Sequence, residues 1–344
     1  MTWFETWRVV YSKLADDAGP MERPAPGRQE AELMAMSGTA MAVEPSGQIL
    51  GATVRGVDLS ASVSDGDFAA ILLALGRHGV LRFPAQRLEA AHLRDFSQRF
   101  GRIQATLTGR HHEPGMAEVG ILSNIIENGE PIGITDAGQD WHTDMSYNPT
   151  IGFLNALYAV KVPRRDGQAL GATAFVNTHA AYDGLSPELQ AKLRNATATH
   201  DFNKFWEKMR VRPGSYRAPM TEEQRRRRPP SVHPVFLTHP ISGRTVLYCN
   251  PGYAIRINEL DPEESDRVLE TLFAHQLQPK YQYLHRWTEG DVLLWDHIGT
   301  LHNAIADYRP DEHRLMKRCQ VMADRIFDPA FLQSALAAGG IAAR

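Results

Sequence analysis

Short apolar runs separated by turn residues fill most of the chain after residue 45. Within many runs apolar and polar residues alternate, which is the period of a β-strand, and glycine, proline or asparagine follows. Many short strands with few long helices predict an antiparallel sandwich or barrel. We expect strands at residues 79–84, 117–124, 151–160, 173–177, 235–240, 245–250, 291–296 and 315–323.

Helical spacing is confined to four segments, at residues 65–79, 89–101, 186–196 and 261–277. The first ends at Gly79, a typical C-cap, and the last begins with the cap-like Asp261-Pro262. The apolar stripe of the first segment consists of Phe68, Ile71, Leu72 and Leu75. The predicted fold class is therefore mainly β with flanking helices.

The chain of 344 residues, 43% of them hydrophobic, can bury a large core as one domain. Residues 1–40 are rich in Pro, Gly, Glu and Met and are expected to form a weakly packed extension. The main domain is expected at residues 41–330, followed by a C-terminal tail at 331–344. Residues 203–232 are polar and interrupted by proline, which favours either a lid or a simple surface excursion.

The net charge of −3 provides no basic field for nucleic acid or an anionic membrane. No run of about 18 apolar residues predicts a transmembrane helix, and the N-terminus lacks the apolar core of a signal peptide. Cys249 and Cys319 are expected to be reduced, buried thiols. These features indicate a cytoplasmic protein with a small-molecule partner, and they leave self-association open.

The stretch "GQDWHTDMSYN" places His142 and Asp144 two positions apart, so on an extended chain both point to one face. A third metal ligand would have to come from another strand. The segment "EGDVLLWDHIGTLHNA" offers His302 after a strand and a loop, with His297 as its rival. Two further alternatives are weaker because each lies in a predicted loop. They are His111-x-Glu113 and Asp140.

Two histidines and one carboxylate on one face of an octahedral ion form the facial triad of non-haem Fe(II) oxygenases. Such an ion leaves three positions open, enough for a 2-oxo acid and dioxygen. The strand at residues 315–323 would place Arg314 and Arg318 on one face, about 13 Å apart. A buried arginine requires an anion, so Arg314 can bind the distant carboxylate of the 2-oxo acid.

These motifs together resemble the TauD/TfdA family of Fe(II)/2-oxoglutarate-dependent dioxygenases. "WHTDMSY", "GDVLLWD…LHNA" and the Arg-x-x-x-Arg of "RLMKR" match the family in order and spacing over roughly residues 45–328. The resemblance implies a double-stranded β-helix, or jelly roll, that oxidises C–H bonds of small, usually anionic molecules. It implies His142, Asp144 and His302 as iron ligands and Arg314 as the residue that binds 2-oxoglutarate.

Two departures from the family pattern affect single contacts. The family often has Gly-Asp-Thr where this chain has Gly-Ala-Thr, and Thr173 is the residue implied to touch 2-oxoglutarate. The family usually has Asn-Arg after Trp295-Asp296, and here His297-Ile298 stands instead. The ligand set itself is complete.

The predicted function is a dioxygenase that uses Fe(II), 2-oxoglutarate and O2. It would hydroxylate a small anionic substrate while 2-oxoglutarate is decarboxylated to succinate and CO2. The alternatives are a metal-binding member without redox chemistry and a zinc hydrolase, which leaves Arg314 unexplained. Arg318 is similar to the family arginine that contacts the substrate anion. The remaining candidates for the substrate pocket are His111, His112, Asn124, Phe205, Trp206 and Tyr253.

Overall fold

The computed structural model describes residues 41–105, 110–212 and 217–340. The extension expected at residues 1–40 lies outside the described residues. The chain divides into two compact units after Gly38, and everything described below belongs to the second unit, Thr39–Arg344.

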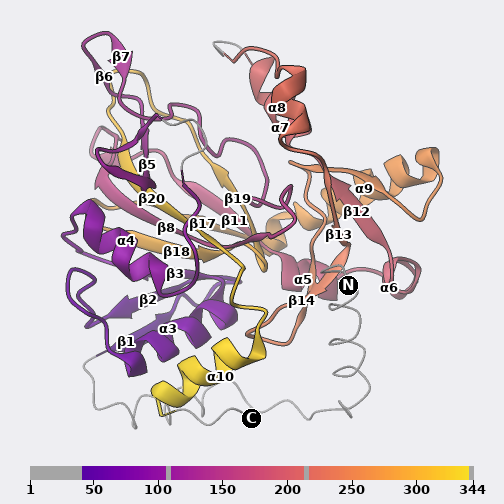
Figure 1. The fold of residues 1–344 in the computed structure, drawn as a ribbon, viewed down its shortest axis with the longest axis horizontal. Helices are drawn as coiled ribbons and strands as arrows, with labels where there is room; N and C mark the ends of the chain where they lie inside the picture. Colours follow the sequence, from indigo (N-terminus) through magenta and orange to yellow (C-terminus); the bar gives the residue numbers. More distant parts are fainter. Residues whose placement is uncertain (1–40, 106–109, 213–216, 341–344) are drawn as a thin grey trace. The chain divides into compact units, whose positions relative to one another are not determined.

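One large sheet forms the centre of the described part (Figure 1). Among its strands β2 and β3 pair in parallel, and the other neighbours pair antiparallel. In spatial order the strands are β1 Ala42–Pro45, β2 Ala52–Arg55, β3 Val80–Phe83, β18 Val292–Asp296, β8 Gly152–Lys161, β20 Leu315–Met322, β5 Met116–Ser123 and β4 His112–Glu113. The predicted strands at 79–84, 117–124, 151–160, 291–296 and 315–323 are all found here.

Smaller sheets complete the β-structure, and all their pairs are antiparallel. The first comprises β17 Gln282–His285, β11 Thr173–Asn177 and β19 Thr300–Ala304. The second comprises β13 Ser231–Pro234, β12 Thr197–His200 and β16 Ala254–Ile257. Three two-stranded pairs are β14 Phe236–Thr238 with β15 Thr245–Leu247, β9 Arg164–Arg165 with β10 Gln168–Ala169, and β6 Ile126–Glu127 with β7 Glu130–Pro131.

Phe175 of β11 joins the first small sheet to the large one. It is fully buried and belongs to one apolar cluster with Leu157 of β8 and Leu293 of β18. Its ring lies 5.6 Å from that of Trp295, measured between ring centroids. Since side chains alternate across a strand, this cluster occupies the space between the two sheets.

Helices surround the sheets, and each predicted helix is present. They are α3 Asp65–His78, α4 Ala90–Gln98, α5 Thr178–Asp183, α6 Pro187–Leu193, α7 Phe202–Arg210, α8 Glu222–Arg226, α9 Pro262–Gln276, η1 Pro279–Tyr281 and α10 Pro329–Ala338. Ser64 caps α3 by accepting from the Asp67 N–H, and Gly79 ends it at a φ of 68°. Among the described helices, none combines the length and the apolar character needed to cross a membrane.

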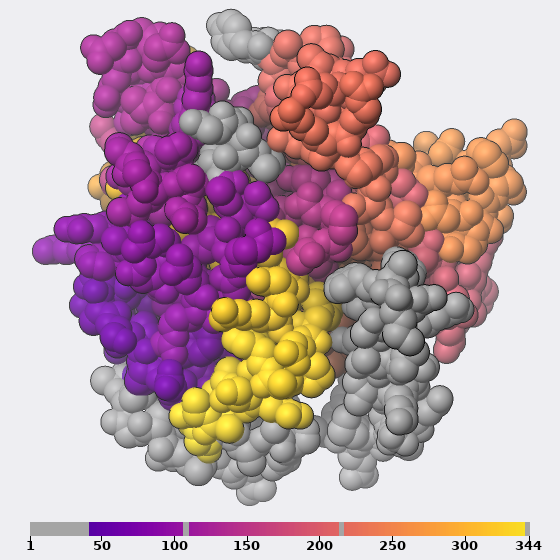
Figure 2. Space-filling view, in the orientation of Figure 1, coloured from indigo at the N-terminus to yellow at the C-terminus, as the bar shows by residue number. Residues whose placement is uncertain are grey.

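Three parts of the chain carry helix that the sequence does not predict: α5, the insertion at 203–232 and the expected tail. The insertion at 203–232 contains α7, whose Phe202, Phe205 and Met209 repeat at helical spacing behind the capping Asp201. The predicted tail contains α10, which follows the Asp328-Pro329 start and contacts α3. Figure 2 shows this C-terminal segment in yellow against the violet N-terminal part of the described chain.

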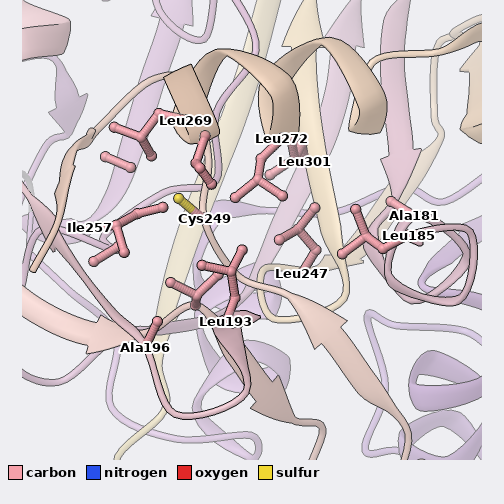
Figure 3. Close-up of a cluster of buried hydrophobic side chains, with 14 of the residues drawn as sticks. Ala181, Leu185, Leu193, Ala196, Leu247, Cys249, Ile257, Leu269, Leu272 and Leu301 are labelled. Atoms are coloured by element: carbon pink, nitrogen blue, oxygen red, sulfur yellow. The ribbon is translucent and has the colours of Figure 1, made fainter. Parts of the chain in front are cut away.

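A second apolar core lies beside the first, between α5, α6, α9 and the second small sheet (Figure 3). Leu247 and Leu272 are fully buried in it.

Cys249 belongs to this core, while Cys319 lies in β20, and both are free and buried. Burial raises the pKa of each thiol to about 12, so both stay protonated at neutral pH.

Leu247→Ala should destabilise the protein by about 2–5 kcal/mol, because it removes a fully buried side chain and leaves a cavity. Leu284→Ala is the matched control, since the same change removes a side chain that is 44% exposed. It should change the free energy of unfolding by no more than about 0.5 kcal/mol. Urea denaturation measures both, and equal losses would show that this core is not packed as described.

Candidate metal centre

His142 and His302 are joined by their backbones. The His142 N–H donates to the His302 carbonyl at 3.1 Å, and the His302 N–H donates to the His142 carbonyl at 2.8 Å. These two bonds form an isolated antiparallel bridge between β19 and the loop that precedes β8. The imidazole rings therefore lie on one side, with centroids 4.2 Å apart.

Asp144 completes the group. One ligand atom from each of His142, Asp144 and His302 lies within 4.8 Å of the other two. The Asp144 carboxylate is 3.4 Å from His142 Nε2 and 3.8 Å from His302 Nε2. Donors about 2.1 Å from a common ion and at right angles to each other lie about 3 Å apart, so small side-chain shifts suffice to bind one ion.

The protonation states of these groups suit a divalent cation. The Asp140 carbonyl lies 2.8 Å from His142 Nδ1 and accepts its proton, which leaves Nε2 as the free donor atom. Burial lowers the pKa of His302 well below its usual range, so that imidazole is neutral. Burial raises the pKa of Asp144, but the facing histidines more than offset this, and the net pKa is well below the usual value. The neutral His302 imidazole and the Asp144 carboxylate are therefore donors that can bind metal at neutral pH.

Asn155 of β8 orients the carboxylate. Its Nδ2 donates to Asp144 Oδ2 at 3.0 Å, and the residue is fully buried. This residue was not predicted from the sequence. The sequence feature that could have indicated it is a polar amide within the otherwise apolar run "IGFLNALYAV".

The rival ligands occupy other positions. His297 is fully buried with its Nε2 3.8 Å from Asp144 Oδ2, and burial lowers its pKa to about 4. It has no hydrogen-bond partner for its ring among the described residues and is not in the group of three. Glu113 is paired with Lys317 at 2.9 Å, and Asp140 is paired with Lys208 and Arg212.

A narrow cavity of about 20 Å³ adjoins His302. It brings Thr173 together with Arg314 and Arg318, which come from a distant part of the sequence. The lining residues are Leu122, Ala137, Gly138, Asn155, Leu157, Thr173, Trp295, His302, Ala304, Arg314 and Arg318.

Arg314 carries a buried charge, since the residue is 7% exposed. Burial lowers the pKa of its guanidinium and the Tyr308 hydroxyl raises it, but an arginine stays charged at neutral pH. No carboxylate of the described residues pairs with it. Its backbone is held on both sides, by Asn124 Oδ1 at 2.8 Å and by the Ser123 hydroxyl at 2.7 Å.

Thr173 keeps a hydroxyl proton for a further acceptor, because its Oγ1 accepts from Trp287 Nε1 at 3.0 Å. His111, His112 and Asn124 are not among the residues that line this cavity. Asn124 instead donates to the carbonyl of Glu312 at 3.0 Å and accepts from the Arg314 N–H. Its side chain thus holds the chain that leads into β20.

Aromatic residues contact the other side of His142. The Phe205 ring lies 4.9 Å and the Tyr253 ring 6.0 Å from the imidazole, measured between centroids. Both belong to a cluster that also contains Met145, Tyr147, Met209 and Met322, with Phe202 packed against it. Trp206, predicted beside them, is not in this cluster and donates to the Ala218 carbonyl at 2.8 Å.

Comparison with known proteins connects this geometry to a chemistry. Residues 42–320 match the family described as taurine catabolism dioxygenase TauD, TfdA family. Pentalenolactone F synthase of Streptomyces avermitilis is 33% identical over 83% of this chain and 94% of its own. The (S)-phenoxypropionate/alpha-ketoglutarate-dioxygenase of Delftia acidovorans is 29% identical over 77% of this chain and 90% of its own.

A solved structure shares the fold. The taurine dioxygenase from Burkholderia xenovorans matches with a TM-score of 0.67 and 26% identity, over 83% of this chain and 90% of the other. The predicted jelly roll with flanking helices is thereby confirmed.

Replacing His142, Asp144 or His302 by Ala should weaken binding of one divalent ion by more than about 100-fold, since changes around a ligand alone cost 10–100-fold. Anaerobic calorimetric titration with Fe(II) or Co(II) measures this. His111→Ala is the control and should bind within about twofold of the wild type. If His297→Ala lost the metal while His302→Ala kept it, the two histidines would have to exchange roles.

Proposed function

Because the chain belongs to the TauD/TfdA family and is a 2-oxoglutarate-dependent non-haem iron dioxygenase, we propose that His142, Asp144 and His302 hold its iron. The observation that carries this proposal is the group itself. Its three ligand atoms lie within 4.8 Å of one another, and all three residues are buried. Two histidines and a carboxylate are the donor set of the facial triad.

The proposed reaction is hydroxylation of a C–H bond of a small organic substrate. Bound Fe(II) supplies the redox chemistry that activates O2, while 2-oxoglutarate is converted to succinate and CO2. The chain's own contribution is to orient the donors. Asn155 and the Asp140 carbonyl do this by fixing the Asp144 carboxylate and the His142 ring.

Arg314 is proposed to bind the distal carboxylate of 2-oxoglutarate. A guanidinium at 7% exposure is costly unless an anion compensates it, and a planar carboxylate matches its fork of donors. Thr173 lines the same cavity and can donate its hydroxyl proton.

The substrate is proposed to combine an anionic group with an apolar body. Arg318 lines the cavity, and its positive charge also affects the tyrosines of the aromatic cluster. Burial raises the pKa of Tyr147 and of Tyr253, and the Arg318 charge opposes both shifts. A carboxylate near Arg318 would therefore leave the rest of the molecule against Phe205 and Met209.

Two of the relatives fit this substrate class by name, the dioxygenases of (S)-phenoxypropionate and of 2,4-dichlorophenoxyacetate. Contacts of His111 and His112 with the substrate stay predictions. The zinc hydrolase and the member without redox chemistry use the same ligands but give Arg314 no role.

Arg314→Ala should raise the concentration of 2-oxoglutarate needed for half-saturation by about 30-fold or more, because removing one partner of a desolvated ion pair costs roughly 2–5 kcal/mol. The visible absorption band formed anaerobically with Fe(II) and 2-oxoglutarate reports the binding. Arg314→Lys should restore it in part, since lysine keeps the charge but loses the fork.

Arg318→Ala is the matched variant, and its 2-oxoglutarate affinity should stay within a few-fold of the wild type. It should instead produce succinate with little oxidised product when phenoxyalkanoates and other carboxylates are screened by oxygen uptake. An absent band in Arg318→Ala together with a normal band in Arg314→Ala would reverse the two roles. Two unchanged titrations would show that neither arginine faces the co-substrate.

A further inference from the structure

Asp140 connects the two segments that carry the proposed iron ligands. Its N–H donates to Asn303 Oδ1 at 2.7 Å, and Asn303 directly follows His302. Its carbonyl accepts from His142 Nδ1 at 2.8 Å. One residue thus fixes the ring of one histidine and the chain beside the other.

The backbone of Asp140 is held in an unfavourable conformation. Its φ is 87°, in the left-handed half of the Ramachandran plot. Only glycine adopts this conformation without strain, and Asn and Asp tolerate it better than other residues. Such a conformation costs roughly 1–3 kcal/mol and persists where the surroundings determine it. The Asp140 carboxylate contributes by accepting from the Trp141 N–H at 2.9 Å.

The same carboxylate binds the insertion at 203–232. Its Oδ2 pairs with Lys208 of α7, and with Arg212 at 3.3 Å. Arg212 also donates to Gln139 Oε1 at 3.1 Å. Four residues before Asp140, Asp136 accepts both ends of the Arg217 guanidinium, at 2.7 and 2.9 Å. The loop before His142 is therefore attached to the insertion by charge at two places.

Helix α7 reaches His142 by a second route. Its Phe205 ring lies 4.9 Å from the imidazole, and Phe205 belongs to the aromatic cluster proposed to hold the substrate. A change in the position of α7 would thus shift the His142 ring by two contacts. One is the Phe205 ring, and the other is the Asp140 carbonyl that accepts from Nδ1.

We propose that Asp140 is a positioning residue that couples α7 to the orientation of the iron ligands His142 and His302. The inference rests on the proposed function, because it takes these histidines as the ligands. Through this link, contacts that a substrate makes with α7 would adjust the metal donors, and loss of the link would loosen them.

A purely structural role for these ion pairs makes a different prediction. Partly exposed pairs contribute about 0–1 kcal/mol to folding, so their removal barely changes stability whether or not the coupling exists. Metal affinity separates the two cases, because partners that orient a ligand typically change it 10–100-fold. Co(II) serves as the probe, since its visible spectrum reports ligand geometry without turnover.

The test is Asp140→Asn, which removes the charge but tolerates the positive φ and leaves the carbonyl that accepts from His142. We expect Co(II) affinity to fall about tenfold, with a changed visible spectrum and an unchanged unfolding midpoint. Glu207→Gln is the matched control. It removes a carboxylate of α7 that pairs with Arg210 on the same helix at 2.7 Å, and it should bind Co(II) within twofold of the wild type.

The link can also be cut from the other end, with Lys208→Met and Arg212→Met together. This variant should reproduce the loss of Co(II) affinity. Combining it with Asp140→Asn should add little, because all three changes remove the ion pairs of the same Asp140 carboxylate. It also keeps the test decisive if Asp140→Asn does not fold. Wild-type Co(II) affinity and spectrum in the Lys208/Arg212 variant, or losses that multiply in the combination, would overturn the coupling.

Failure of the proposed function gives a different result. If His142→Ala binds Co(II) as tightly as the wild type, the ligand assignment itself is wrong. If His142→Ala loses the metal while the variants of Asp140 and of Lys208 with Arg212 behave like Glu207→Gln, only the coupling is wrong.

Discussion

Two backbone hydrogen bonds between His142 and His302 carry the arrangement of the site. The two histidines are 160 positions apart, by subtraction of their residue numbers, and the bridge fixes their rings as neighbours. Asp144 follows His142 by two residues, so it is placed as soon as the bridge forms. The strands on either side, β19 and β8, then hold the bridge within the fold.

The charges of the site indicate which ligands it can bind. The proposed metal ligands contribute one carboxylate, and the cavity beside them is lined by two arginines. A divalent ion added to this set leaves an excess of positive charge that the described residues do not neutralise. A dianion such as 2-oxoglutarate compensates part of it, and a substrate carboxylate compensates more. Under the proposed assignment, the co-substrate would lie near Arg314 and the substrate near Arg318, both of which line the cavity.

The sequence predicted the parts of the site that lie within short motifs. His142-x-Asp144 and Arg314-x-x-x-Arg318 were selected because residues at these spacings share one face of a strand. In the structure, His142 forms an isolated bridge and Asp144 lies in a turn, so this segment is not the strand that this prediction assumed. Alternating apolar runs predicted strands β3, β5, β8, β11, β14, β15, β18 and β20, and helical spacing predicted α3, α4, α6 and α9. Strands such as β12, β13, β16 and β19 were not predicted. Asn155 and the pairing of Asp140 with α7 were not found, since they are contacts between distant segments and leave no periodic signal. Helix α10 was missed because a small-residue segment such as "SALAA" has a weak apolar stripe.

The two buried thiols have a consequence for an enzyme that works with oxygen. Oxidants attack the thiolate, and at a pKa of about 12 a neutral solution leaves about one thiol in 10⁵ ionised. Cys249 and Cys319 are then poor targets, although Cys319 directly follows Arg318 at the cavity. The fold thus buries both thiols in surroundings that keep them protonated, and a protonated thiol reacts slowly with oxidants.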